Sequence, residues 1–289
     1  MSDVDAPYAV LETLELGIGR LLAQNPSPFT FMGTQTYFAG EEEVVVIDPG
    51  PDLPEHVAAI VAALDGRRVV AIACTHTHRD HSPASRALAA ATGAPIVGCA
   101  ALALESVGPR ADASFDFDYR PDRALADGEA IEVDGHAFTA VATPGHTSNH
   151  LCFAYRGALF TGDHVMGWST TVVVPPDGDM GDYMTSLDKL RQRDDRVFYP
   201  AHGPAVTKPQ QLLRGLIGHR MQRERQILKR LEVGDRTVPQ IVAAAYPGLD
   251  PRLVPAAGGS VTAHLLDLVR RGLVISVSDG QGGMQWRTT

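Results

Sequence analysis

The 289-residue sequence predicts a layered α/β protein followed by a smaller, mostly helical domain. Short runs rich in Val, Ile and Phe alternate with stretches of helical periodicity, as expected for strands and helices that share one core. Four of the apolar runs end directly before a short loop that carries His or Asp. Beyond residue 208 the pattern becomes helical and the charge becomes basic, so we expect domains at residues 1–208 and 209–289.

The elements of the first domain follow from apolar runs bounded by glycine and proline. Two hairpin strands are expected at residues 37–39 and 44–47, followed by a helix at 54–64 and a buried strand at 68–73. A second helix is expected at residues 83–92, and a further strand at 94–98. Three later strands are expected at residues 138–142, 158–161 and 197–200. Gly40 suits the hairpin turn, and Pro83 suits the start of a helix.

The most informative stretch follows the expected strand at residues 68–73. It is Cys74-Thr75-His76-Thr77-His78-Arg79-Asp80-His81-Ser82. His76 and His78 are two residues apart and can face one ion in an extended backbone, whereas Asp80 and His81, beyond a turn, can reach toward a second ion. Imidazoles with one carboxylate suit zinc, iron or manganese. A single histidine is often structural, but three histidines and an aspartate within six residues rarely occur by chance. We therefore interpret the stretch as a metal site.

Three further potential ligands follow later strands. His146 lies in the loop after residues 138–142, Asp163 follows residues 158–161, and His202 follows residues 197–200. Separate loops that each offer one ligand at a strand end can converge on one point. Glycine and proline beside each ligand restrict the backbone, which suits a metal site because its geometry tolerates little error.

Four neighbouring residues are candidates for supporting or substrate-facing roles. Asp48 ends an expected strand and suits either a turn or the orientation of the metal loop, two readings of equal weight. His150 is expected to support a ligand or to pack rather than to bind metal. His164 suits a substrate-facing group or a structural hydrogen bond, and Trp168 suits pocket lining or simple packing. His56 and His136 are expected at the surface or in turns without a role, and the acidic stretches 41–43 and 112–118 are expected at the surface.

The ordered motifs between residues 44 and 203 resemble the metallo-β-lactamase superfamily, in its glyoxalase-II-type dinuclear arrangement. The resemblance implies an αβ/βα sandwich with the active site at one edge, between two mixed sheets. It implies that a first metal is held by His76, His78 and His146, and that a second metal is held by Asp80, His81 and His202. It also implies that the carboxylate of Asp163 bridges the two metals. A drug-hydrolysing lactamase is disfavoured because such enzymes lack the bridging aspartate, which this chain has as Asp163. The flavo-diiron branch is disfavoured because that branch has Glu where this chain has His78.

The chain is more closely similar to the branch called β-lactamase-like protein 2, which carries a C-terminal winged-helix-like domain. This resemblance extends over nearly the whole chain through less diagnostic segments. They are residues 25–30 and 33–37, 167–171, 175–180 and the motif His219-Arg220…Arg223-Glu224…Gln226-Ile227-Leu228.

Such a site has a definite chemistry. Two divalent ions about 3.5–4 Å apart can share one water and lower its pKa to near neutrality, which creates a hydroxide nucleophile. They also stabilise the oxyanion that forms when the hydroxide attacks. We therefore expect a hydrolase whose metal-bound hydroxide attacks a thioester or related ester of a small molecule, with Asp80 and Asp163 as the catalytic carboxylates. Two zinc ions are the expected cofactors, with iron or manganese as alternatives.

The C-terminal domain has the element order of a winged helix. Helices are expected at residues 210–231, 238–246 and 260–271, followed by strands at 273–277 and 284–286. A winged helix can place its second helix in a DNA groove, but the early turns of that helix offer mainly His264. We therefore favour a structural or oligomerisation role over nucleic-acid binding. The alternative functions are a single-strand endoribonuclease and, below it, a lactonase or a non-enzymatic winged-helix regulator.

Bulk properties limit the partners and the compartment. The net charge is −9, but residues 205–289 carry 12 Lys/Arg against 6 Asp/Glu, so a local attraction for nucleic acid is confined to that region. No apolar run approaches the roughly 18 residues of a membrane span, and the acidic N-terminus lacks a secretory signal. Cys74, Cys99 and Cys152 form no Cys-x-x-Cys pair and are expected to be buried thiols. We expect a cytoplasmic protein that acts on a small molecule, does not bind membranes and is compatible with homo-oligomers.

Overall fold

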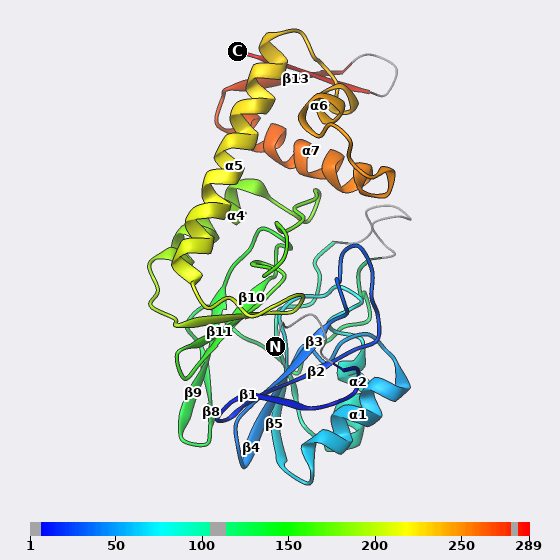
Figure 1. Ribbon diagram of the computed structural model, residues 1–289, viewed down its shortest axis with the longest axis vertical. Helices are drawn as coiled ribbons and strands as arrows, with labels where there is room; N and C mark the ends of the chain where they lie inside the picture. The colour runs from blue at the N-terminus through cyan, green and yellow to red at the C-terminus, as the bar shows by residue number, and fades with distance from the viewer. Residues whose placement is uncertain (1–6, 105–113, 279–282) are drawn as a thin grey trace. The chain divides into compact units, whose positions relative to one another are not determined.

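The computed structural model describes residues 7–104, 114–278 and 283–289, and Figure 1 shows their helices and strands. The chain divides into two compact units. The first comprises residues 1–143, 149–171 and 194–209, and the second comprises residues 144–148, 172–193 and 210–289. A short segment around residue 146 and a longer one around residue 180 therefore belong with the C-terminal region. The domain boundary expected at residues 208/209 stays a prediction.

The first unit contains a mixed sheet in which, among the described residues, seven strands follow one another in sequence order. They are β1 (Glu12–Glu15), β2 (Ile18–Leu22), β3 (Gln35–Ala39), β4 (Glu43–Ile47), β5 (Arg68–Cys74), β6 (Ile96–Gly98) and β7 (Arg123–Ala124). The first four strands are antiparallel, and the pairs from β4 to β7 are parallel. Helix α1 (Pro54–Leu64) connects β4 to β5, and α2 (Ala84–Thr92) connects β5 to β6.

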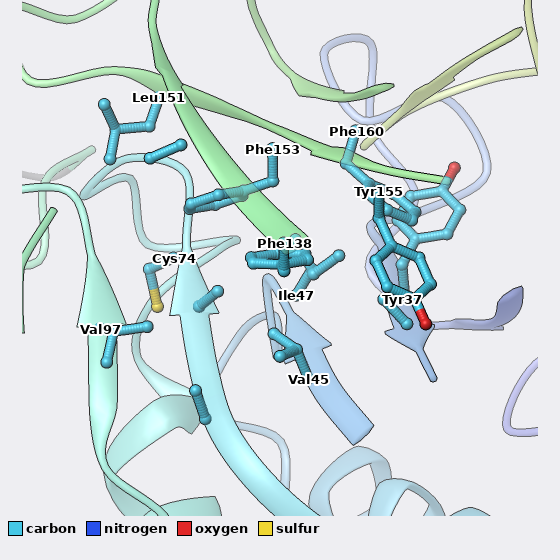
Figure 2. Close-up of a cluster of buried hydrophobic side chains, with 14 of the residues drawn as sticks. Tyr37, Val45, Ile47, Cys74, Val97, Phe138, Leu151, Phe153, Tyr155 and Phe160 are labelled. Atoms are coloured by element: carbon cyan, nitrogen blue, oxygen red, sulfur yellow. The ribbon is translucent and has the colours of Figure 1, made fainter. Parts of the chain in front are cut away.

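Strand β4 shows why its sequence forms a sheet buried on both faces. Its residues are apolar without interruption, and successive side chains point to opposite faces. Val44 and Val46 join the apolar cluster that contains Ile60 of α1 and Leu88 of α2. Val45 and Ile47 belong to a different cluster, on the other side of the sheet (Figure 2). The helices therefore cover one face of the sheet, and the other face is free to pack on a second sheet.

The second sheet of this unit supplies the other half of that core. Its strands are β12 (Val197–Pro200), β11 (Ala158–Gly162), β10 (Leu151–Tyr155), β9 (His136–Ala142) and β8 (Ala130–Val133), in spatial order. Only β11 and β12 pair in parallel among these described strands. Phe138 and Phe153 stack with ring centroids 5.0 Å apart and face the apolar residues of β4 and β5 (Figure 2). Two mixed sheets therefore enclose one aromatic-rich core.

The two sheets are joined by hydrogen bonds at the edge where four strands end. The amide of Leu151 donates to the carbonyl of Thr75 at 2.8 Å, and the amide of Gln35 donates to the carbonyl of Ala201 at 2.8 Å. Because β4 and β5 are parallel, and β11 and β12 are parallel, each pair delivers its following loop to this edge. Most of the predicted site residues lie in those loops.

The second unit contains the C-terminal elements and one helix from the middle of the chain. They are α4 (Met180–Arg191), α5 (Pro209–Glu232), α6 (Val238–Ala245), the 3₁₀ turn η2 (Pro251–Leu253), α7 (Val254–Arg270) and the hairpin of β13 (Val274–Ser278) with β14 (Met284–Thr288). Ile227, Ile241, Leu265 and Trp286 share one buried core. Helices followed by a hairpin form the predicted winged-helix order.

The expected elements are present with small shifts of their ends, and one start was wrong. Helix α7 begins at Val254 rather than at residue 260. A Cβ at Gly259 would lie 2.6 Å from Cγ2 of Val174, so glycine there permits close packing within a continuous helix. Strand β10 and helix α4 were not predicted.

Two surface assignments were also wrong. His56 is 2% exposed, and its Nε2 lies 2.9 Å from Oγ1 of Thr36; burial lowers its pKa to about 4. Asp116 is 5% exposed, although Asp118 and His136 are exposed as expected. Asp112 lies outside the described residues. The three cysteines are buried free thiols, as predicted. Among the described helices, none is long and apolar enough to cross a membrane.

The inter-sheet core yields a stability prediction. Phe138 is 0% exposed, and replacing it with alanine removes a stacked ring and leaves a cavity. Phe138→Ala should lower the free energy of unfolding by about 3–5 kcal/mol, measured by urea denaturation. Leu16→Ala is the control, because Leu16 is 70% exposed and should cost less than about 0.5 kcal/mol. Equal effects of the two substitutions would contradict this packing.

Candidate metal centre

A buried carboxylate orients the first part of the metal loop. Asp48 follows β4 with a left-handed backbone (φ 46°) and is 1% exposed. Its Oδ1 accepts from the amide of Thr75 at 2.8 Å, and its Oδ2 accepts from the Thr75 hydroxyl at 2.8 Å. Because that hydroxyl has only one hydrogen, its oxygen must accept from Nδ1 of His76, 2.9 Å away. The Nε2 of His76 is thereby left with a lone pair. Of the two roles considered for Asp48, these hydrogen bonds favour the orienting group, since no turn is assigned at this residue.

The same carboxylate orients His81. Oδ2 of Asp48 lies 2.9 Å from Nδ1 of His81, and a carboxylate can only accept, so Nδ1 carries the hydrogen. His81 is 0% exposed, and its Nε2 lies 3.5 Å from Oδ2 of Asp80 and 3.6 Å from Oδ2 of Asp163. One buried group thus fixes the ring orientation of two predicted ligands.

His202 is oriented by a backbone carbonyl from the other end of the chain. Its Nδ1 lies 3.1 Å from the carbonyl oxygen of Gly33 and must donate to it. Its Nε2 lies 3.2 Å from Oδ2 of Asp80 and 3.3 Å from Oδ1 of Asp163. The two oxygens of Asp163 are therefore divided between His202 and His81, which are both predicted ligands of the second metal.

These contacts test whether the site suits a cation. The Nε2 atoms of His81 and His202 are buried and have no hydrogen-bond partner among the described residues. In the neutral imidazoles, each Nε2 presents a lone pair to carboxylate oxygens, which also present lone pairs. Such an arrangement is repulsive unless a proton or a metal ion lies between the atoms. The donor set, imidazole nitrogen and carboxylate oxygen, is one that zinc, iron and manganese accept. The residues therefore fit a metal ion.

The proton affinities of the ligands point the same way. Burial lowers the pKa of His81, but the carboxylates of Asp80, Asp163 and Asp48 outweigh burial and raise that pKa well above its usual 6.5. Burial likewise lowers the pKa of His202, and Asp163 and Asp80 raise it overall. Burial raises the pKa of Asp80, but His81 and His202 hold it well below its usual range. In the metal-free protein, protons on the two imidazoles thus occupy the positions that metal ions would take.

The loop after β11 holds Asp163 rigidly. The amide of Asp163 lies 3.3 Å from Nε2 of His150, and its carbonyl accepts from the Thr171 hydroxyl at 2.9 Å. A Cβ at the preceding Gly162 would lie 2.7 Å from both Nε2 of His150 and Oγ1 of Thr75, so only glycine fits there. His150 therefore supports a predicted ligand, as the sequence indicated.

The structure places the remaining candidates around this core. His78 lies beside His76, with 2.9 Å between Nδ1 of His78 and Nε2 of His76. His164 is 0% exposed, and its ring lies 5.8 Å from that of His150. Trp168 is 36% exposed and packs on Phe31 with ring centroids 5.0 Å apart. The direct roles of His164 and Trp168 toward a substrate stay predictions.

His146 belongs to the second unit, unlike the other six predicted ligands. Its Nδ1 lies 2.6 Å from the carbonyl oxygen of Val172, in the same unit. A carbonyl can only accept, so Nδ1 carries the hydrogen and Nε2 keeps the lone pair required of a ligand. Its place in the first metal site stays a prediction.

The sequence did not reveal three supporting residues. The hydroxyl of Thr75 links the Asp48 carboxylate to the ring of His76, and the carbonyl of Gly33 orients the ring of His202. Asp116 accepts from the Ser82 hydroxyl and from Nη1 of Arg86, each at 2.8 Å, and its amide donates to the carbonyl of Thr77 at 2.7 Å. The acidic composition around Asp116 hid its role, whereas the aromatic residues beside it, Phe115 and Phe117, could have indicated a buried segment.

Comparison with known proteins identifies two regions. Residues 29–202 match the Metallo-beta-lactamase superfamily, and residues 237–286 match the Beta-lactamase associated winged helix domain. The first region spans every predicted ligand from His76 to His202. The second spans α6, α7, β13 and the first part of β14.

Two relatives align with most of the chain. The Beta-lactamase-like protein 2 homolog of Caenorhabditis elegans is 34% identical over 230 residues, which cover 77% of this chain and 73% of the relative. An Atrochrysone carboxyl ACP thioesterase of Aspergillus chevalieri is 32% identical over 257 residues, which cover 83% and 76%. Among solved structures, a Beta-lactamase domain protein from Burkholderia ambifaria is similar with a TM-score of 0.84, over 99% of this chain and 96% of that chain. Its 17% sequence identity supports the fold alone.

The raised pKa values of His81 and His202 predict a pH-dependent metal affinity. Both imidazoles keep their protons to a higher pH than an ordinary histidine, so protons compete with metal above pH ~6.5 as well as below it. Zinc affinity should rise with pH through this range, and binding should release protons. Calorimetric titrations in two buffers of different ionisation enthalpy measure this release.

Stability of the metal-free protein provides the control, with the opposite sign. A raised folded pKa contributes stability that is fully present below the unfolded pKa of about 6.5 and is lost as pH rises through the folded pKa. The stabilisation that His81 and His202 give to chelator-treated protein should therefore decrease as the pH rises above ~6.5, and the thermal midpoint measures it. Zinc binding without any proton release would contradict the predicted protonation.

Asp48 yields a second prediction. Asp48→Asn should weaken zinc binding by about 10–100-fold, because the ring orientations of His76 and His81 both depend on this carboxylate. Competition with a chromophoric chelator measures the change. Asp118→Asn is the matched control, since Asp118 is exposed. Equal affinities of the two variants would show that Asp48 does not orient the site.

Proposed function

The chain belongs to the metallo-beta-lactamase superfamily of hydrolases, and we propose that its reaction is the metal-dependent hydrolysis of a small-molecule thioester or related ester. The predicted fold, an α/β sandwich of mixed sheets with a C-terminal winged helix, is confirmed. The observation that carries the proposal is the opposition of buried imidazole Nε2 atoms to the carboxylates of Asp80 and Asp163, which calls for cations.

The proposed ligands divide into two sets that share one carboxylate. His76, His78 and His146 would hold one ion, Asp80, His81 and His202 would hold the other, and Asp163 would contact both. Zinc is the proposed metal, with iron or manganese as alternatives that use the same donors. When bound, such ions act as Lewis acids and lower the pKa of a coordinated water.

The residues of the chain keep these donors in place before a substrate arrives. The amide of Thr75 and the hydroxyl of the same residue hold the Asp48 carboxylate, which in turn holds the proton on Nδ1 of His81. His150 and Thr171 hold the backbone of Asp163 on both sides. A site whose donors are already oriented loses little free energy to reorganisation during the reaction.

The carboxylates of the proposed site are more exposed than three of its imidazoles. His76, His81 and His202 are 0% exposed, whereas the side chain of Asp80 is 28% exposed and that of Asp163 is 12% exposed. A substrate would therefore approach from the carboxylate side. We propose Asp80 and Asp163 as the carboxylates nearest the reacting atoms.

The thioester proposal rests on the relatives and on charge. A 32% identical relative is named a thioesterase, with alignment over most of both chains. Residues 1–204 carry 13 Lys/Arg against 28 Asp/Glu, so the catalytic region gives no general attraction for a polyanion. A thioester carbonyl is a suitable electrophile for a nucleophile generated at this site.

A ribonuclease is the second candidate, because the C-terminal region is basic. The structure weakens it in one respect. His264, the main basic group on the early turns of α7, is 2% exposed, and Arg270 and Arg271 pair with carboxylates. Helix α7 therefore offers little to a phosphate backbone. A lactonase and a non-enzymatic regulator remain lower alternatives, and the cytoplasmic location and homo-oligomerisation stay predictions.

Turnover of a thioester and of RNA tests the proposal directly. Zinc-loaded protein should hydrolyse a neutral acyl thioester, such as an acyl N-acetylcysteamine, and a chelator should abolish the activity. The rate should change little between about 50 and about 200 mM salt, because a neutral substrate makes no phosphate contacts. Asp163→Ala should lower kcat/KM by about 100-fold, with thiol release as the measurement.

Cleavage of single-stranded RNA without thioester turnover would replace the proposal with the nuclease. Such an activity should fall steeply over the same salt range, because phosphate contacts depend on counterion release. Thioester turnover that survives the chelator, or full activity of Asp163→Ala with two metals retained, would contradict the two-metal site.

A further inference from the structure

The segment that carries His146 belongs to the same compact unit as the winged helix. Residues 144–148 group with residues 172–193 and 210–289, whereas the other six proposed ligands belong to the first unit. The position of His146 can therefore depend on contacts that the other ligands do not have.

A backbone carbonyl from the same unit holds the ring of His146. The carbonyl of Val172 accepts from its Nδ1 at 2.6 Å. This bond fixes the tautomer and the ring orientation of the ligand. Val172 begins a segment without helix or strand, residues 172–179, that contains a turn at residues 175–177 and that we call the strap. The strap ends at Asp179, the N-cap of α4.

The strap also holds the backbone on both sides of His146. The amide of Asp179 donates to the carbonyl of Gly145 at 2.9 Å, and the amide of Ser148 donates to Oδ1 of Asp177 at 3.2 Å. Gly145 has φ 137°, and a Cβ there would lie 2.4 Å from Cα of Tyr183 in α4. The ligand segment therefore has no freedom to move independently of the strap and α4.

Helix α7 of the winged helix holds the strap at its middle and at its end. A Cβ at Gly259 would lie 2.6 and 2.8 Å from the two methyl carbons of Val174, so the helix backbone packs directly on this side chain. At the end of the strap, Nη2 of Arg270 donates to Oδ1 of Asp179 at 2.8 Å, and Nη1 pairs with Oδ2. This double contact lowers the pKa of the Asp179 carboxyl.

We propose that the winged-helix domain is a positioning element of the metal centre. Helix α7 holds the strap, and the strap holds the imidazole of His146 through the carbonyl of Val172. The proposal rests on the ligand role of His146 in the proposed function. It gives the C-terminal domain a structural task toward the metal site, with Gly259 and Arg270 as positioning residues.

The two contacts differ in weight. The side chain of Arg270 is 53% exposed and that of Asp179 is 27% exposed, so solvent screens this ion pair. The packing of Val174 on Gly259 is steric and is not screened. Substitution at Gly259 should therefore move the strap more than substitution at Arg270.

Neighbouring glycines of α7 provide a matched test. Gly259→Ala should push Val174 and, two residues away, the carbonyl of Val172. It should weaken zinc binding at one of the two equivalents by about tenfold and change the visible spectrum of the cobalt-substituted protein, which reports ligand geometry. Gly258→Ala is the control, because a Cβ there meets only Cγ1 of Val238, at an ordinary 3.7 Å. Alanine favours the helix equally at both positions.

Two further variants keep the test decisive if Gly259→Ala is poorly folded. Arg270→Gln should weaken the same zinc equivalent in the same direction by a smaller factor, whereas Arg252→Gln, which breaks the exposed pair with Asp250, should leave both equivalents unchanged. The double substitution Gly259→Ala/Val174→Ala removes the clash and should restore the affinity and the cobalt spectrum. A general loss of stability would not be reversed in this way.

His146→Ala separates failure of the inference from failure of the proposed function. Retention of both zinc equivalents by His146→Ala would overturn the ligand role and, with it, the two-metal site as proposed. Loss of one equivalent by His146→Ala, with Gly259→Ala and Arg270→Gln both unchanged, would overturn the inference alone. The expected result is loss of one equivalent in His146→Ala and selective weakening of the same equivalent in the α7 variants.

Discussion

The carboxylate of Asp48 accepts three hydrogen bonds, and the orientation of the candidate metal centre depends on them. Thr75 donates from its amide and its hydroxyl, and His81 donates from Nδ1. A buried carboxylate is costly unless it is fully hydrogen-bonded. Satisfying it fixes the start of the metal loop and leaves the Nε2 atoms of His76 and His81 as acceptors. The interactions that make this carboxylate tolerable also prepare the site for a cation.

Parallel strand pairs in both sheets make this arrangement possible. Strand β4 delivers Asp48 beside the loop that follows β5, and β11 delivers Asp163 beside His202, which follows β12. Hydrogen bonds from Leu151 and Gln35 join the two sheets at the same edge. Mutually facing carboxylates and imidazoles would repel or trap protons there without a metal. The fold therefore places these costly polar groups where a divalent ion would compensate them.

Local sequence patterns predicted much of the fold but not the long-range contacts. Helix α1 has the predicted bounds because its apolar spacing and Pro54 are local signals. The link between Asp48 and Thr75 spans 27 residues, and only the folded sheet reveals it. The start of α7 was misplaced because Gly259 acts through its packing on Val174. Asp116 was misplaced because its partners Ser82 and Arg86 lie about 30 residues away.

The sequence proposes seven ligands, because strand ends followed by His or Asp are a local pattern, and their role as ligands stays a prediction. Their division into two metal sites is the central claim. X-ray absorption of the zinc-loaded protein, with its metal content, tests it most directly. The account predicts two zinc ions per chain, nitrogen and oxygen ligands without sulfur, and zinc–zinc scattering at about 3.5–4 Å. A single zinc ion per chain, or coordination by sulfur, would contradict it.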